Sequence, residues 1–360
     1  DRKTTFLLDR GIWDRPKYQV DPHVPAVLHP LEASRPTADA ADPPTRLDFA
    51  RWLVDKRSPL TARVHVNRVW QTVFGAGLVR TPEDFGTRAP QPDHLQLLDW
   101  LAVEFMERGW STKHLLMTIV KSATYQQSSR ASAALRQIDP LNQWFTRGPR
   151  FRVEAEVVRD ITLTASGLLK RDIGGPSVFP PMPESVLSDL YTRPQYWDVA
   201  QDAHRYRRAL YIYRKRSMPD PALASLDAPN ADAACARRAR SNTPLASLVV
   251  MNEPIFVEAA RALALRILRE GGATDRERID YAFQLCTGRH AHAAQQEEVL
   301  ALLAMQYDRL NAGELTADAI ITGEAAETPE IPSVATPADA AAWTIVARVL
   351  LNLDETLSKN

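Results

Sequence analysis

The stretch RSPLTARVHVNRVWQTVFGAGLVRTPEDFG, residues 57–86, predicts the fold class of this chain of 360 residues. At 100° per residue, a helix over residues 59–74 places apolar side chains along one continuous stripe. The members of that stripe are Ala62, Val66, Val69, Trp70, Val73 and Phe74. Such a stripe is typical of a helix packed into a protein core, and Gly75 is suited to end it as a C-cap.

Two polar side chains, Arg63 and Asn67, fall inside the Trp70 edge of this stripe. A buried guanidinium needs a carboxylate or a backbone acceptor, because breaking a buried ion pair costs about 3–5 kcal/mol. We expect Arg63 and Asn67 to hold the following loop by hydrogen bonds, with Glu83 and Asp84 as the carboxylates nearest in sequence. A ligand-binding site formed by Arg63, Asn67 and Trp70 is the alternative.

Motifs of known chemistry are missing from the sequence. The segment FGAGLVR contains Gly75 and Gly77, but Arg80 stands where a phosphate-binding turn needs a third glycine, and a helix precedes it. Signatures for covalent haem, zinc proteases, phosphate-binding loops and serine hydrolases do not occur either. We therefore expect no cofactor within this chain and no metal site.

Amphipathic patterns predict helices over much of the chain. They cover residues 93–108, 112–124, 152–169, 244–251, 254–270, 275–286, 292–310 and 338–352. Four pairs of a hydroxyl residue and proline are expected helix starts, since the hydroxyl caps a backbone N–H and proline loses nothing there. The pairs are Ser58-Pro59, Thr81-Pro82, Thr243-Pro244 and Thr336-Pro337, and Asp339 adds a weak capping box to the last.

The remaining segments indicate little regular structure. Residues 173–184 form a predicted glycine and proline loop, and residues 206–216 alternate like a strand that pairs within 173–180. The predicted fold class is mainly α: a multi-helix globular domain with a small β element in the middle and an extended proline-rich N-terminal arm. The expected parts are the arm (1–44), an N-terminal helical part (45–172), a loop-rich part with short strands and a basic cluster (173–240), and a C-terminal helical part (241–360) that forms one globular unit with 45–172.

The composition of the chain indicates which partners and environments to expect. Lys plus Arg and Asp plus Glu both total 44, so the net charge gives no general attraction to nucleic acid, which we do not expect as a partner. No apolar run approaches the roughly 20 residues of a membrane helix, so we expect no membrane span. Cys235 and Cys286 are too few for a disulfide framework, and a bridge between them stays open. Because the sequence begins at Asp1, we expect a processed or trimmed chain.

His94 and Glu154 both fall on the apolar side of a predicted helix. A lone histidine in such a place is more often a core residue than a ligand. Glu154 in a first helical turn is stabilised by unbonded N–H groups, although a buried carboxylate can also serve as an acid or base. We interpret both as structural; together with Asp84 they are the weak catalytic candidates.

Basic residues concentrate in residues 205–240. This segment contains nine of them but only three aspartates, although the protein as a whole is neutral. The nine are Arg205, Arg207, Arg208, Arg214, Lys215, Arg216, Arg237, Arg238 and Arg240. The region around Asp227, Cys235, Arg237 and Arg238 is the candidate binding segment for an anionic glycan, a haem propionate or a phosphate. Pairing of these cations with acids elsewhere in the fold is the alternative.

Several long segments resemble one family in their order. They include SPLTARVHVNRVWQTVFGAGLVRTPEDFG, FRVEAEVVRDITLTASGLL, GGPSVFPPMPE and LDAPNADAACARRARSNTPLASLVVMNEPIFVEAARALA. These are similar to family 1553 of the domains of unknown function, the C-terminal domain of large planctomycete proteins with cytochrome-type domains. The resemblance extends from about residue 45 to the closing LLNLDE. Thr72-Val73 departs from the family pattern, which often has histidines before FG.

The resemblance implies an exported protein of the periplasm or cell surface, often found near sulfatases or polysaccharide-degrading functions. It supplies no catalytic residue, and any haem belongs to a part of the protein outside this sequence. The leading hypothesis is an accessory or interaction module of a redox-associated multidomain protein that binds a cytochrome-type or other domain of that protein, or an anionic polysaccharide. An enzyme acting on polysaccharide, built from Arg63, Asn67, Asp84, His94 and Glu154, is one alternative. A structural component of the cell envelope is another.

Overall fold

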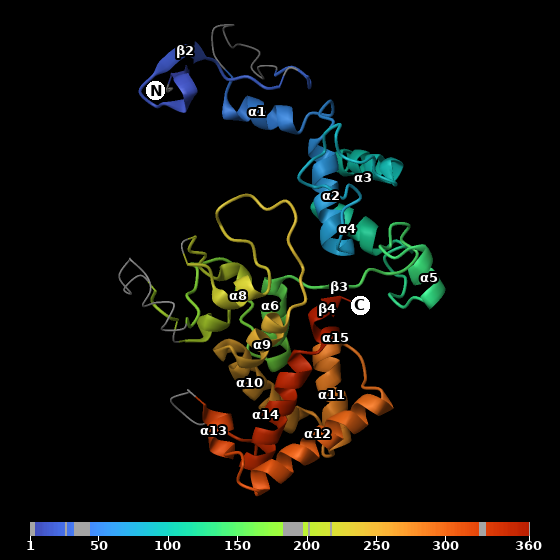
Figure 1. Ribbon diagram of the computed structural model, residues 1–360, viewed down its shortest axis with the longest axis vertical. Helices are drawn as coiled ribbons and strands as arrows, with labels where there is room; N and C mark the ends of the chain where they lie inside the picture. Colours follow the sequence, from blue (N-terminus) through green and yellow to red (C-terminus); the bar gives the residue numbers. More distant parts are fainter. Residues whose placement is uncertain are drawn as a thin grey trace. The chain divides into compact units, whose positions relative to one another are not determined.

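In a computed structural model of the protein, the described residues are 4–25, 27–31, 44–182, 197–200, 202–216, 218–323 and 329–359. They divide into two compact units, unit 1 (Asp1–Pro149) and unit 2 (Arg150–Asn360), both shown in Figure 1. Helices predominate, and the strands within the described ranges form two small two-stranded sheets. The prediction of a mainly α fold is confirmed.

Unit 1 combines a short hairpin with a group of helices. Its elements are β1 (Thr5–Leu8), η1 (Asp9–Gly11), β2 (Pro16–Val20), α1 (Arg46–Leu53), α2 (Thr61–Phe74), α3 (Leu95–Glu107), α4 (Thr112–Val120) and α5 (Ala133–Ile138). Strands β1 and β2 pair antiparallel, a hairpin that the sequence analysis did not predict. The extended arm over residues 1–44 stays a prediction, because residues 1–3, 26 and 32–43 lie outside the described ranges.

The core of unit 1 lies between α2, α3 and α4. The predicted stripe of α2 faces that core, where Ala62, Val66, Trp70 and Phe74 are buried. Trp70 stacks on Phe74 with ring centres 4.2 Å apart. Gly75 has φ of 85° and ends α2 as its C-cap, as predicted. The sequence therefore predicted both the face and the end of this helix.

Unit 2 is built on a longer set of helices. Its elements are β3 (Phe151–Arg152), α6 (Ala155–Ser166), η3 (Ala203–Tyr206), η4 (Ala209–Tyr211), α8 (Pro221–Ser225), α9 (Pro244–Asn252), α10 (Pro254–Glu270), α11 (Asp275–Thr287), α12 (Ala293–Asn311), α13 (Ala317–Thr322), α14 (Pro337–Leu351), α15 (Asp354–Leu357) and β4 (Ser358–Lys359). None of the helices in the described ranges has the length and apolarity that crossing a bilayer requires.

Helix α10 joins the two cores of unit 2. Its later turns pack with α11, α12, α13 and α14 around the buried Trp343, and the alanines of α14 allow close helix contact. Its first turns pack with α6, α8, α9 and residues 209–212 in a second core. Strand β3 pairs antiparallel with β4, which ties the first residues of unit 2 to the end of the chain.

Residues 206–216 do not form the predicted regular strand. They do pair with the predicted segment 173–180, through Val178. The backbone N–H of Val178 donates to Tyr211 (2.8 Å), and that of Tyr213 donates to Val178 (2.9 Å). The last residue of η3 and the whole of η4 also fall within the segment. The Asp160 carboxylate accepts the N–H of Ala209 at 2.7 Å, which removes this donor from any strand pairing.

Two of the four predicted helix starts are correct. Thr243 and Thr336 cap α9 and α14 with their hydroxyl groups, and Asp339 completes a full capping box. Ser58 is wrong as a cap, since α2 begins at Thr61 without a side-chain cap. Thr81 is wrong because its hydroxyl donates to the carbonyl of Asp84 (2.9 Å) and closes a turn, with no helix after it.

The division of the chain at residue 149 differs from the predicted parts. The sequence analysis placed residues 45–172 in one helical part and joined it to residues 241–360. In the structure α6 packs against α10 and α11, so it belongs with the C-terminal helices. An amphipathic pattern shows that a helix has a buried face, but it does not show which helix covers that face.

Candidate functional site

The candidate site is an exposed loop of unit 2, residues 228–240, which we call the arginine loop. It leaves α8 and returns to α9 without a regular helix or strand, as Figure 1 shows in gold. Most of its side chains are exposed, including Cys235 and Arg237. Exposed loops on a rigid scaffold are where binding residues often lie.

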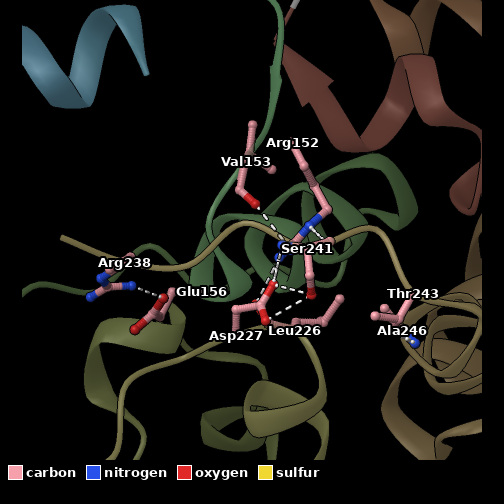
Figure 2. A network of polar contacts seen from close by, with 9 residues as sticks. All are labelled: Arg152, Val153, Glu156, Leu226, Asp227, Arg238, Ser241, Thr243 and Ala246. Carbon is pink, nitrogen blue, oxygen red and sulfur yellow. Dashed lines mark hydrogen bonds and ion pairs between the residues drawn. The ribbon is translucent and has the colours of Figure 1, made fainter. Parts of the chain in front are cut away.

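Three residues close the base of the arginine loop, as Figure 2 shows. We call Arg152, Asp227 and Ser241 the base clamp. Ser241 donates its backbone N–H (2.7 Å) and its hydroxyl (2.9 Å) to the Asp227 carboxylate. The Arg152 guanidinium pairs with Asp227 and also donates to the carbonyls of Ser241 (2.9 Å) and Leu226 (3.1 Å). The two ends of the loop are thus held together through one carboxylate and one guanidinium.

Asp227 is adapted to this role. Its φ is 64°, in the left-handed region where aspartate is more frequent than most residues. Burial by itself would raise the pKa of its carboxyl, but the hydrogen bonds from Ser241 and the Arg152 guanidinium lower the pKa below its ordinary value. Asp227 therefore stays ionised at neutral pH, which keeps the clamp closed.

Carboxylates at the start of α6 pair with the arginines of the loop. Arg238 contacts Glu154 (3.0 Å) and Glu156 (2.6 Å). Arg214 also pairs with Glu156, and Arg240 lies 3.7 Å from Glu154. Burial acts to raise the pKa of Glu156, whereas Arg238 and Arg214 lower it, and the net pKa is below the ordinary value. Glu154 is the N-cap of α6 but makes no side-chain cap bond, so its partners are these arginines rather than the predicted N–H groups of the first turn.

The other basic residues of 205–216 also find partners within unit 2. Arg205 pairs with Glu258 (2.7 Å), Arg208 with Asp160 (3.2 Å) and Arg216 with Asp232 (3.3 Å). The buried Arg207 instead donates to backbone carbonyls of residues 172–176 and lies over the ring of Tyr211. For Arg205, Arg208 and Arg216 the structure therefore shows the alternative interpretation of the basic segment, pairing with acids of the fold.

Two acids that the sequence analysis did not single out lie at helix starts of unit 2. Asp220 accepts from the N–H of Leu223 (2.9 Å) at the start of α8, and Glu253 accepts from Ile255 (3.0 Å) at the start of α10. Burial raises the pKa of both, and mutual repulsion contributes to raising that of Glu253 to about 7. The buried Arg159 partly offsets this effect through its charge.

A sequence signal for these acids existed. Both stand directly before a proline that opens a helix, the same pattern that we applied to Ser and Thr only. Arg152 carries no such signal, because its contacts with Leu226 and Ser241 join residues 74 and 89 positions apart.

The candidates of unit 1 bond to different partners. Arg63 pairs with Asp99 (2.6 Å) rather than with Glu83 or Asp84. The fully buried Asn67 donates to the carbonyl of Val79 (3.1 Å) and accepts from its N–H (2.8 Å). The prediction that Asn67 holds the following loop is therefore confirmed, whereas the same prediction for Arg63 is wrong, because a carboxylate of α3 lies closer.

The remaining candidates of unit 1 also have partners within it. His94 contacts the carbonyl of Gln143 (2.9 Å), and Asp84 accepts from the N–H of Gly86 (2.8 Å). Trp70 lies in the core, and its ring meets that of Phe145 edge-on. His94 and Trp70 thus both pack against the segment that contains Gln143 and Phe145, whereas Asp84 bonds within its own turn.

Cys235 and Cys286 are both free thiols, one exposed and one buried, so they do not bridge. Within the described ranges, no three His, Cys, Asp or Glu side chains come together as a metal site.

These features define a mainly helical protein with an arginine loop fixed over paired carboxylates. The chain matches the family described as PSD1, protein of unknown function (DUF1553), over residues 45–303, and it belongs to that family. The match begins where the resemblance predicted but ends within α12, before α14 of the unit 2 core. Comparison with curated proteins and with solved structures gives no match.

Proposed function

We propose that this chain is an accessory interaction module of an exported planctomycete multidomain redox-associated protein, in the periplasm or at the cell surface. The arginine loop binds a neighbouring cytochrome-type domain of the same protein, and any haem belongs to that domain. The observation that carries the proposal is the base clamp, which fixes an exposed loop at both ends. A loop held in one conformation loses less entropy on binding than a mobile one.

The charge balance favours a folded domain over an anionic glycan. Arg238 and Arg240 of the loop pair with Glu154 and Glu156, and Asp232 of the loop pairs with Arg216, so much of the charge in this region is engaged within unit 2. A polyanion gains most from uncompensated cations. A protein surface can instead use the shape of the loop together with its exposed Cys235 and Arg237.

Cross-linking through Cys235 tests the proposal. Burial raises the pKa of Cys286 to about 12, so the buried thiol does not form the thiolate that reacts with maleimide. We expect benzophenone maleimide to label Cys235 alone. After illumination, the labelled chain should cross-link to the purified cytochrome-type domain of the same gene product.

Two variants serve as controls. Ser241→Ala opens the base clamp and should lower the cross-linking yield several-fold. Cys235→Ser with Met305→Cys moves the label to an exposed position of α12 and should give no cross-link. A gene product without a haem-binding region, or equal yields from both label positions, would contradict the proposal. Loss of the cross-link on adding dextran sulfate, with saturable binding of that polymer, would assign the loop to a glycan.

The alternative of a polysaccharide-degrading enzyme gains no geometric support from unit 1. There Arg63, Asn67, Asp84 and His94 each bond to a different partner. Glu154 belongs to unit 2, where it pairs with arginines of the loop.

A further inference from the structure

A groove of about 670 Å³ lies on unit 2, away from the residues of the base clamp. The C-terminal end of α6 forms one side of it, and α10 and α11 form the other. Its volume falls within the roughly 300–1,000 Å³ of small-molecule sites in proteins. Nothing in the proposed role of the arginine loop uses this groove.

The groove carries an excess of positive charge. Three arginines line it, Arg171, Arg266 and Arg269, against one carboxylate, Glu270. Glu270 accepts from the hydroxyl of Tyr281 and from Arg266 (3.0 Å), whereas Arg269 lies 3.9 Å away. Within the described part of the chain, Arg171 contacts no carboxylate. Arg171 and Arg269 are both exposed, so their guanidinium groups can pair with an incoming anion.

Arg266 offsets the negative partial charge at the C-terminal end of α6, which would otherwise repel an anion from the groove. The C-terminal end of a helix carries unbonded carbonyls with partial negative charge, which repel anions. Arg266 donates to the carbonyls of Ala165 (3.0 Å) and Thr164 (3.4 Å) at the end of α6. Its guanidinium thus covers these oxygen atoms, and the two outer arginines determine the sign of the potential in the groove.

Apolar side chains supply the rest of the wall. Leu168, Leu265 and Leu285 line the groove and are each partly exposed. A wall of this kind next to exposed guanidinium groups suits a molecule with an apolar body and an acidic end. We propose that the groove binds a small amphiphilic anion, with its carboxylate or sulfate group on Arg171 and Arg269 and its hydrocarbon part against the leucines.

Calorimetric titration of the full chain with octanoate tests this site. We expect saturable binding with a Kd below about 1 mM. The variants Arg171→Gln and Arg269→Gln should each weaken binding by about fivefold. Arg216→Gln is the matched control, since Arg216 is 74% exposed and pairs with Asp232 in another part of unit 2. It should leave the Kd unchanged, and circular dichroism should show the same helix content for all variants.

Two further probes separate the contributions of charge and apolar surface. Octanol keeps the hydrocarbon body without the charge, and acetate keeps the charge with only a methyl group. Both should bind at least about tenfold more weakly than octanoate. The proposal would be overturned if octanoate binding did not saturate. It would also be overturned if octanoate bound equally well to the double variant Arg171→Gln/Arg269→Gln. Octanol or acetate binding as tightly as octanoate would also overturn it.

Discussion

Asn67 is the residue on which the loop after α2 most depends. It bonds to both backbone groups of Val79 from a fully buried position, and a Cβ atom at Gly77 would lie only 2.6 Å from its amide nitrogen. We expect Asn67→Ala to lower the free energy of unfolding of unit 1 by about 2–4 kcal/mol, because a buried N–H and a buried C=O both lose their partners. Hydrogen exchange of the Val79 amide measures this effect directly, since the amide loses its only side-chain acceptor.

Arg63→Gln provides the matched control on the same helix. Its pair with Asp99 is more than a third exposed, so its loss should cost less than about 1 kcal/mol. A Val79 amide that stays equally protected in Asn67→Ala would contradict the assigned role of Asn67.

The difference between these two residues shows what the sequence can predict at the scale of a residue. Helical periodicity placed both Arg63 and Asn67 near the buried stripe, and the partner of Asn67 lies only 12 positions away. The partner of Arg63 lies 36 positions away on α3. Arg152 and Asp227 are 75 positions apart, so the base clamp depends on how α6, α8 and α9 pack together, which no local pattern reveals.

Among the elements, α14 has the most complete start. Thr336 accepts from the N–H of Asp339, and the Asp339 carboxylate accepts the N–H of Thr336 (2.7 Å) and the hydroxyl of Tyr307 on α12 (2.7 Å). We expect Thr336→Ala to destabilise unit 2 by about 1 kcal/mol, the usual cost of removing a cap. Thr316→Ala is its control, because Thr316 precedes α13 without a side-chain cap bond and should change stability by less than about 0.5 kcal/mol. Hydrogen-exchange protection of α14 should report the difference, and equal losses in the two variants would contradict it.

The sequence predicted the long helices far better than the short elements. Each long helix has an apolar stripe of several turns, so its period is clear even where its ends are not. Helices α1, α5, α8, α13 and α15 have eight residues or fewer and were missed. Such short helices gain most of their stability from tertiary packing, for example Ala222 and Leu223 of α8 in the second core of unit 2.

At the scale of the whole molecule, the acids Asp220 and Glu253 link the stability of unit 2 to pH. Burial and the nearby charge of Asp220 raise the pKa of Glu253 to about 7 in the folded state, against 4.5 as its ordinary value. Between these two values the folded protein holds a proton that the unfolded chain has lost. The contribution of Glu253 to stability is therefore complete below about pH 4.5 and is lost as the pH rises through about 7. The loss amounts to roughly 3 kcal/mol at most.

Carboxylates such as Asp227 and Glu156 work in the opposite direction, because their folded-state pKa values are lowered and their contribution to stability appears as the pH rises.

The contribution of Glu253 must therefore be measured as a difference between variants. Glu253→Gln keeps an oxygen acceptor for the N–H of Ile255 but cannot ionise. We expect this variant to gain stability over the wild-type chain as the pH rises from about 4.5 to about 7, while the two differ little at low pH. Hydrogen exchange of the buried α10 amides at several pH values reports the global opening of unit 2 without requiring both units to unfold together.

Glu258→Gln on the same helix is the comparison, since that carboxylate pairs with Arg205 and its loss should not reproduce the trend. If the stability difference between Glu253→Gln and wild type were constant over this range, Glu253 would have to be ionised throughout. Its carboxylate would then have to be better solvated or better paired than the hydrogen bond from Ile255 and the charge of Arg159 indicate.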